Sequence, residues 1–163
     1  MLNKVIHGLT TLTRYIALTT MTLMMLFITV AVVSRLFFSP VIGDVEIVQL
    51  GMVVLIMCGL AYTQQVGGHI SIELVVNKFP EKVQQFCDIV ANLFSLVVTL
   101  MIAYIYLEVA FNHKDHMQLS TNLLEIPYYP FDFIIVLGFL MWGLESLLKL
   151  IKSIIVIFSS QNE

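Results

Sequence analysis

The sequence predicts an all-α integral membrane protein with four transmembrane helices and one interfacial amphipathic helix between the second and third. Hydrophobic residues make up 59% of the 163 residues and charged residues only 12%, with a mean hydropathy of +0.94. Ordinary globular domains carry about 25% charged residues. Four apolar runs reach the roughly 20 residues that cross a bilayer. We expect one transmembrane domain over residues 1–163, with spans at residues 15–38, 45–65, 83–111 and 131–150.

The first span, residues 15–38, is too long for the apolar core of a cleaved signal peptide, which has about 7–15 residues. It also lacks a small-residue cleavage site, so we expect a retained helix. Thr19, Thr22 and Thr29 lie within it. Their hydroxyls either bond a neighbouring helix or the carbonyl four residues earlier, and the sequence leaves both alternatives open.

The second span, residues 45–65, starts with two acidic residues. Asp44 is expected to be the N-cap and Glu46 lies in the first turn, where negative charge is favourable. Gly51 and Gly59 lie eight residues apart, and we expect them to let another helix approach one face closely.

Arg35 ends the first span, close in sequence to Asp44 and Glu46. An ion pair across this short connection would stabilise the first hairpin. The alternatives are a side chain that extends to lipid headgroups, or one that contacts a partner protein.

The segment 69–79 is too short and polar to span, but its apolar residues recur at helical spacing. It follows Gly67-Gly68 and ends before Pro80, which a helix interior does not accommodate. We expect an amphipathic helix along the membrane surface. His69, Lys78 and Lys82 are its expected contacts with the interface.

The third span, residues 83–111, carries polar side chains at steps of four, three, four and seven, which form one stripe. Such a stripe faces protein or water, because lipid offers no hydrogen-bond partners. It contacts either other helices of this chain or a second subunit. The stripe consists of Asp88, Asn92, Ser95, Thr99 and Tyr106.

The fourth span, residues 131–150, follows Tyr128 and Tyr129, which are placed where an aromatic belt meets the membrane interface. Glu145 and Lys149 are spaced i, i+4 and are expected to pair near the far interface.

Basic residues predict the orientation. With four spans, six of the eight Lys and Arg residues lie on the side of the two termini, and Arg35 and Lys114 lie on the other. Positive residues favour the cytoplasmic side. We expect a multi-pass protein of the bacterial inner membrane with both termini in the cytoplasm.

Little in the sequence points to chemistry of its own. The net charge of −3 and the absence of Lys/Arg runs argue against nucleic acid. Cys58 and Cys87 form no metal motif, and His113 and His116, at i, i+3, fit a solvated loop better than a weak metal site. We predict no catalytic, metal or cofactor site, and no enzyme.

The order of Arg35, Pro40, Asp44/Glu46 and GLAYTQQVGGHISIELV at residues 59–75 resembles the small membrane subunit of TRAP transporters, the tripartite ATP-independent periplasmic transporters. The resemblance covers roughly residues 10–155. It implies a scaffold for a large elevator-type permease, which holds the substrate and sodium sites, and a periplasmic binding protein that delivers an organic acid. Sialic acid is slightly favoured over a C4-dicarboxylate.

On this resemblance, polar residues near the loops and on the third span are candidates for contact with the permease or the binding protein. Two other classes remain: a haem- or quinone-linked anchor of an oxidoreductase, and a small self-associating channel. The candidate interface residues are Arg35, Asp44, Glu46, Lys114, Asp88, Asn92, Ser95 and Thr99.

Overall fold

The computed structural model describes residues 2–66, 80–117 and 119–160. Four of its helices are long and apolar enough to cross a membrane, which confirms the predicted class. The interfacial helix predicted at residues 69–79 lies outside the described residues. The elements are α1 (Leu2–Phe37), α2 (Asp44–Gln65), α4 (Glu81–Asn112), the π-helical turn η1 (His113–Met117) and α5 (Tyr129–Ser160).

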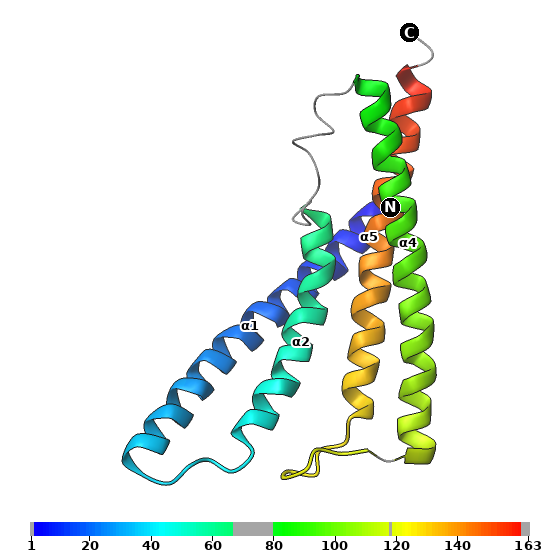
Figure 1. Cartoon of the computed structure of the whole chain (residues 1–163). Helices are drawn as coiled ribbons and strands as arrows, with labels where there is room; N and C mark the ends of the chain where they lie inside the picture. The colour runs from blue at the N-terminus through cyan, green and yellow to red at the C-terminus, as the bar shows by residue number, and fades with distance from the viewer. Residues whose placement is uncertain (1, 67–79, 118, 161–163) are drawn as a thin grey trace.

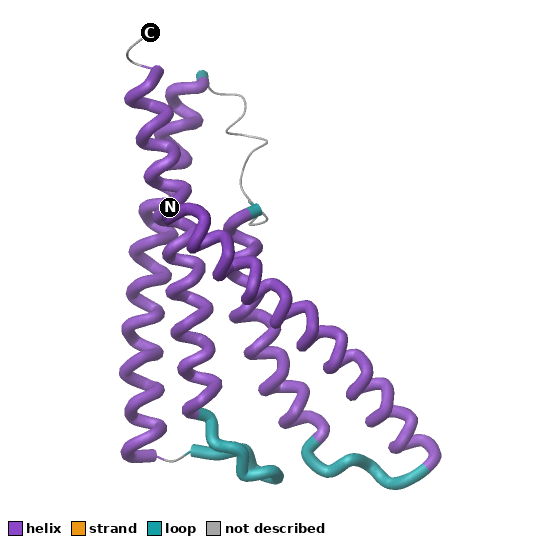
Figure 2. Tube along the Cα trace, turned by 180° about the vertical axis from the view of Figure 1, so that it is seen from behind, coloured by secondary structure: helices purple, strands orange, loops and turns teal. Residues whose placement is uncertain are grey.

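The helices form two hairpins, α1 with α2 and α4 with α5, and α2 packs against α5 (Figure 1). We call the end with the amino end of α1 and the carboxyl end of α5 the terminal end, and the opposite end the loop end. Toward the loop end α1 diverges from α4 and α5, which both views show (Figures 1 and 2). The two hairpins are therefore splayed rather than closed into a compact bundle.

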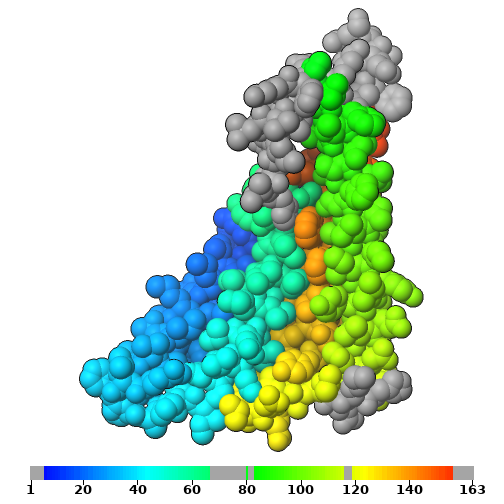
Figure 3. All heavy atoms as spheres, viewed as in Figure 1, coloured from blue at the N-terminus to red at the C-terminus, as the bar shows by residue number. Residues whose placement is uncertain are grey.

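Most of α1 packs against α2 alone, so its apolar side chains cover a broad surface of the molecule (Figure 3). The hydroxyls of Thr19, Thr22 and Thr29 donate to carbonyl oxygens four residues earlier, at 2.8–3.0 Å. This is the second of the two alternatives that the sequence left open. A threonine satisfied in this way can face lipid without leaving its hydroxyl unpaired.

Gly51 of α2 lets α1 approach, as predicted: a Cβ atom there would lie 2.9 Å from Sδ of Met24. At Gly59 a Cβ atom would meet no described atom within 4 Å, so no described helix makes the predicted close approach there. Eight residues turn a helix by two full turns and about 80° more, so the two glycines do not share one contact line.

Two glycines of α5 mark its contacts with the neighbouring helices. A Cβ atom on Gly138 would lie 2.8 Å from the carbonyl oxygen of Met57 on α2, and one on Gly143 would lie 3.1 Å from Oγ1 of Thr99 on α4. Because both contacts lie on α5, this helix joins the two hairpins.

The turn into α2 depends on Gly43, whose φ of 76° is in the left-handed region that favours glycine. Gly43 is the N-cap, and Asp44 is the first residue of the helix rather than its cap as predicted. One oxygen of Asp44 accepts the N–H of Val45 at 2.8 Å. The other oxygen of Asp44 accepts a hydrogen bond from Arg35 of α1. The side chain therefore does not cap the backbone N–H of the third helical residue, as an N-cap side chain would.

Candidate functional site: a buried polar cluster and a loop-end clamp

Glu145 of α5 is the centre of a polar cluster at the terminal half of the bundle. The residue is only 1% exposed. One of its carboxyl oxygens accepts a hydrogen bond from Thr10 Oγ1 at 2.6 Å and lies 3.3 Å from Nδ1 of His7. Gln65 of α2 contacts the same His7 nitrogen through Nε2. A carboxyl group of α5 is thus connected to both helices of the first hairpin.

Gln64 makes the second part of this cluster. Its side-chain amide donates to Oδ1 of Asn92 on α4 at 3.3 Å and to Oγ of Ser146 on α5 at 3.1 Å. The Ser146 hydroxyl also lies 3.0 Å from that of Ser95 on α4. All four membrane helices therefore contribute. The polar cluster comprises His7, Thr10, Gln64, Gln65, Asn92, Ser95, Glu145 and Ser146.

The hydrogen bonds of the polar cluster join helices to one another. Its hydrogen-bonding groups are directed at one another, and buried polar groups are stabilising only when they are paired in this way. In a membrane the alternative is an unsatisfied group in hydrocarbon, so the cluster holds the two hairpins at a defined position.

The predicted pair of Glu145 with Lys149 is present only as a longer-range attraction among the described residues, because the carboxyl group is directed at Thr10 and His7 of α1. The i, i+4 spacing describes only contacts along one helix, whereas Glu145 lies on the face that α1 crosses. A carboxyl inside an apolar span is by default directed at protein, and this signal was available in the sequence.

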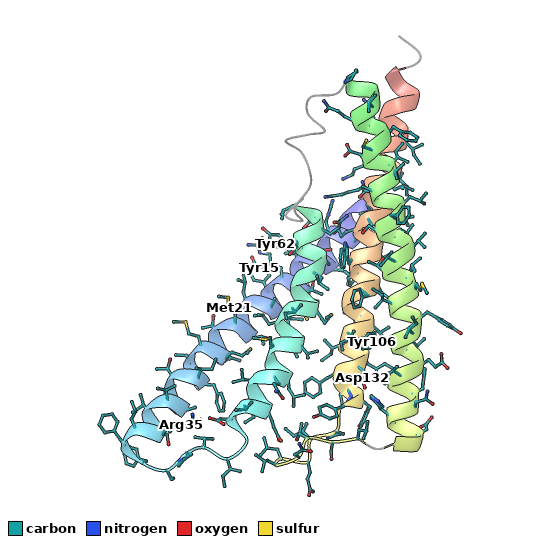
Figure 4. The ribbon with its side chains drawn as sticks, viewed as in Figure 1. Tyr15, Met21, Arg35, Tyr62, Tyr106 and Asp132 are labelled. Carbon is teal, nitrogen blue, oxygen red and sulfur yellow. The ribbon has the colours of Figure 1, made fainter. Side chains whose placement is uncertain are left out.

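Arg14 lies beside the polar cluster, at the terminal end. Its guanidinium stands 4.8 Å from the ring centroid of Tyr62 on α2 and 5.5 Å from that of Tyr15. Tyr15 of α1 and Tyr62 of α2 lie near each other (Figure 4). These cation–π contacts give the charge a favourable environment at the edge of the bundle.

A loop-end clamp holds the opposite end of the molecule. Arg35 donates from Nη2 to Asp44 Oδ2 at 2.6 Å, so the ion pair expected across the first hairpin is formed. The two oxygens of Glu46 accept the backbone N–H groups of Leu123 and Leu124, at 2.8 and 3.0 Å. The loop before α5 is therefore bound to the start of α2, and these five residues form the clamp.

His113 begins η1, where α4 changes to a π-helical turn. Its Nδ1 lies 2.7 Å from Oδ2 of Asp132, in the first turn of α5 (Figure 4). Asp132 is 8% exposed. The expectation that His113 lies in a solvated loop is wrong for this residue, because α4 continues as helix until the imidazole meets α5.

The sequence matches the model of one family, the DctQ component of tripartite ATP-independent periplasmic transporters, over residues 24–155. The chain belongs to this family. A search of curated proteins found no match. DctQ proteins are components of a transporter and not an enzyme family.

In this DctQ chain the candidate interface residues predicted on the third span and in the loop after it divide into two groups. Asn92, Ser95 and Thr99 face α2 or α5, and the Thr99 hydroxyl also donates to the Ser95 carbonyl at 2.8 Å. Asp88 is exposed, as is Lys114 in η1. A docking role for any of them stays a prediction.

The residues predicted at the membrane interface occupy several places. Tyr129 begins α5 directly after Tyr128, and Lys82 is in the first turn of α4. His69 and Lys78 lie outside the described residues.

The two histidines whose side chains are described, His7 and His113, lie at opposite ends of this DctQ chain. A membrane bis-histidine haem needs two imidazoles that face each other at similar depth. Both rings are instead directed at carboxyl groups, so this pair does not support the oxidoreductase-anchor alternative.

Proposed function

We propose that this DctQ chain is the small scaffold subunit of a sodium-coupled transporter in the bacterial inner membrane. It pairs with a large elevator-type permease and helps dock a periplasmic substrate-binding protein for uptake of an organic acid, sialic acid or a C4-dicarboxylate. Membership of the DctQ family supports this general partnership. Substrate choice and sodium coupling are assigned to the other two components.

One observation supports the scaffold role most directly: the polar cluster is used to join helices. A transporter that works alone has polar groups that line a path for solute and ions. In the described part of this chain the membrane-embedded polar cluster is bonded internally, whereas wide apolar faces on α1 and α4 are exposed. Such faces suit contact with lipid and with another membrane protein.

We infer that the terminal end is cytoplasmic and the loop end periplasmic, from the excess of Lys and Arg near the termini. The loop-end clamp then faces the binding protein. Arg35 keeps 60% of its side chain exposed despite its bond to Asp44. Together with exposed Lys114, it is the best candidate for a polar contact with that partner.

The test is purification of the tagged chain from its native cell in mild detergent, with identification of bound proteins by mass spectrometry. We expect a large multi-spanning permease in about equal molar amount. An unrelated membrane protein with the same tag is the control for non-specific capture. Recovery of the chain alone, or with a soluble oxidoreductase, would contradict the proposed function.

A further inference from the structure

One face of α4 is directed away from the other described helices (Figure 1). Its residues recur at alternating steps of four and three. Phe94 and Tyr104 are each 70% exposed and Met101 is 64% exposed, whereas Thr99 and Ala103, on the opposite face, are buried. We call this face the outer stripe. It comprises Val90, Phe94, Val97, Met101, Tyr104 and Glu108.

The five steps of the outer stripe average 3.6 residues, which is the repeat of an α-helix, so its six side chains lie along one line that a second helix can cover. Within this chain no described helix occupies the stripe. A shallow apolar groove near its terminal end is lined by Phe86, Cys87, Val90, Ala91 and Phe94. Such a groove accepts side chains of a second helix laid along α4.

Glu108 makes the stripe chemically distinctive. It is exposed and makes no hydrogen bond or ion pair with any side chain that the structure describes. It lies five residues, about 8 Å along the helix, further from the loop end than His113, which already contacts the first turn of α5. Glu108 therefore lies within the segment of α4 that is long and apolar enough to cross a membrane, Val83–Asp115, and it is exposed on the outer stripe.

An outward carboxyl group in hydrocarbon needs a donor, and lipid tails supply none. A second copy of this chain does not supply one either: two parallel copies joined along the outer stripe would place one Glu108 opposite the other. A helix with an arginine or lysine at this depth gives a complementary partner. Tyr104, one turn away, adds a hydroxyl on the same side.

We propose that the outer stripe of α4 binds one transmembrane helix of the large permease, and that this helix carries an arginine or lysine that pairs with Glu108. The identity of the partner rests on the proposed function. The position of the interface and the chemistry of the contact rest on the outer stripe itself.

The first experiment places the photo-crosslinking residue p-benzoylphenylalanine at Tyr104 in the full chain in its native membrane. The matched control is Leu107, which is also exposed on α4 at nearly the same depth but lies about 90° or more around the helix from the centre of the stripe. We expect strong crosslinking to the permease from Tyr104 and little from Leu107. The crosslinked peptide should belong to a transmembrane helix that contains Arg or Lys.

The second experiment reverses the charge. Glu108→Lys should lower copurification of the permease about thirtyfold, because an unpaired charge remains on each side. Changing the crosslinked Arg or Lys of the permease to Glu should restore it. Asp115→Lys, the same charge change at an exposed position in η1, should leave copurification unchanged.

Each outcome is decisive. Suppose that the wild-type chain still recovers the permease, but Tyr104 crosslinks to a second copy of this chain or only to lipid. That result overturns the outer stripe as the permease interface and leaves the proposed function intact. If Glu108→Lys and Asp115→Lys recover equal amounts of the permease, the proposed pairing of Glu108 with an Arg or Lys of the permease is overturned. If the wild-type chain recovers no permease at all, the proposed function itself fails.

Discussion

At the scale of single residues, Glu145 shows how an apolar helix accommodates a carboxyl group. The group accepts a hydrogen bond from Thr10 of α1 at 2.6 Å, and Nδ1 of His7 lies 3.3 Å from the same oxygen. Removing one partner from a buried polar network leaves the others unpaired, which costs more than the net value of any one bond.

Glu145→Ala is therefore expected to destabilise the chain by about 3 kcal/mol, because it removes the carboxyl group that links α5 to Thr10 and His7 of α1 and opens a cavity. Glu145→Gln should cost less, since an amide oxygen still accepts from Thr10. The measurement is unfolding in detergent followed by the fluorescence of the single Trp142.

The control for this prediction is Asp88→Ala, which removes an exposed carboxyl group at the same end of the bundle. It should change stability by no more than about 0.5 kcal/mol. Equal losses for Glu145→Ala and Asp88→Ala would show that the polar cluster does not hold the hairpins together.

The contrast between Arg35 and Glu145 explains what could be predicted at this scale. Arg35 and Asp44 are nine residues apart across one short connection, so their pairing follows from local sequence. Thr10 precedes Glu145 by 135 residues. Their contact depends on which helices become neighbours and at what height, and hydropathy carries no information on either.

At the scale of helices, the close approach of α2 and α5 depends on a missing side chain. A Cβ atom at Gly138 would lie 2.8 Å from the carbonyl oxygen of Met57, and neither backbone can yield without moving its helix. We expect Gly138→Ala to cost about 1–3 kcal/mol through overpacking.

Gly59→Ala is the matched control, because a Cβ atom there would meet no described atom within 4 Å. It should be neutral or stabilise by up to about 1 kcal/mol, since alanine favours the helix. Both variants are compared by thermal unfolding in the same detergent. A Gly138→Ala protein as stable as Gly59→Ala would refute the close contact of α2 with α5.

The existence of the four helices was predictable, because apolar runs of this length have few alternatives in a membrane. The residues at which these helices begin and end were harder to predict. α1 begins at Leu2 rather than near residue 15, since its polar amino end is stabilised by α5 and α2 rather than by lipid. The continuation of α4 into η1 likewise follows from the contact of His113 with Asp132.

At the scale of the whole molecule, two splayed hairpins are joined by polar groups at the terminal end and by a loop-end clamp. Between these ends, α1 and α4 expose broad apolar faces. Such faces suit contact with lipid and with other membrane proteins, which agrees with membership of a family of transporter components.

The proposed orientation of that assembly can be tested on Lys114 and Lys152, which are exposed at opposite ends of the chain. Each is changed to cysteine in a background that carries Cys58→Ala and Cys87→Ala. Because basic residues collect near the termini, we expect a membrane-impermeant maleimide to label Lys114→Cys in intact spheroplasts and Lys152→Cys only after permeabilisation. Labelling of both variants after permeabilisation shows that each site is reactive. The reverse pattern in intact spheroplasts would place the loop-end clamp in the cytoplasm, where it could not meet a periplasmic binding protein.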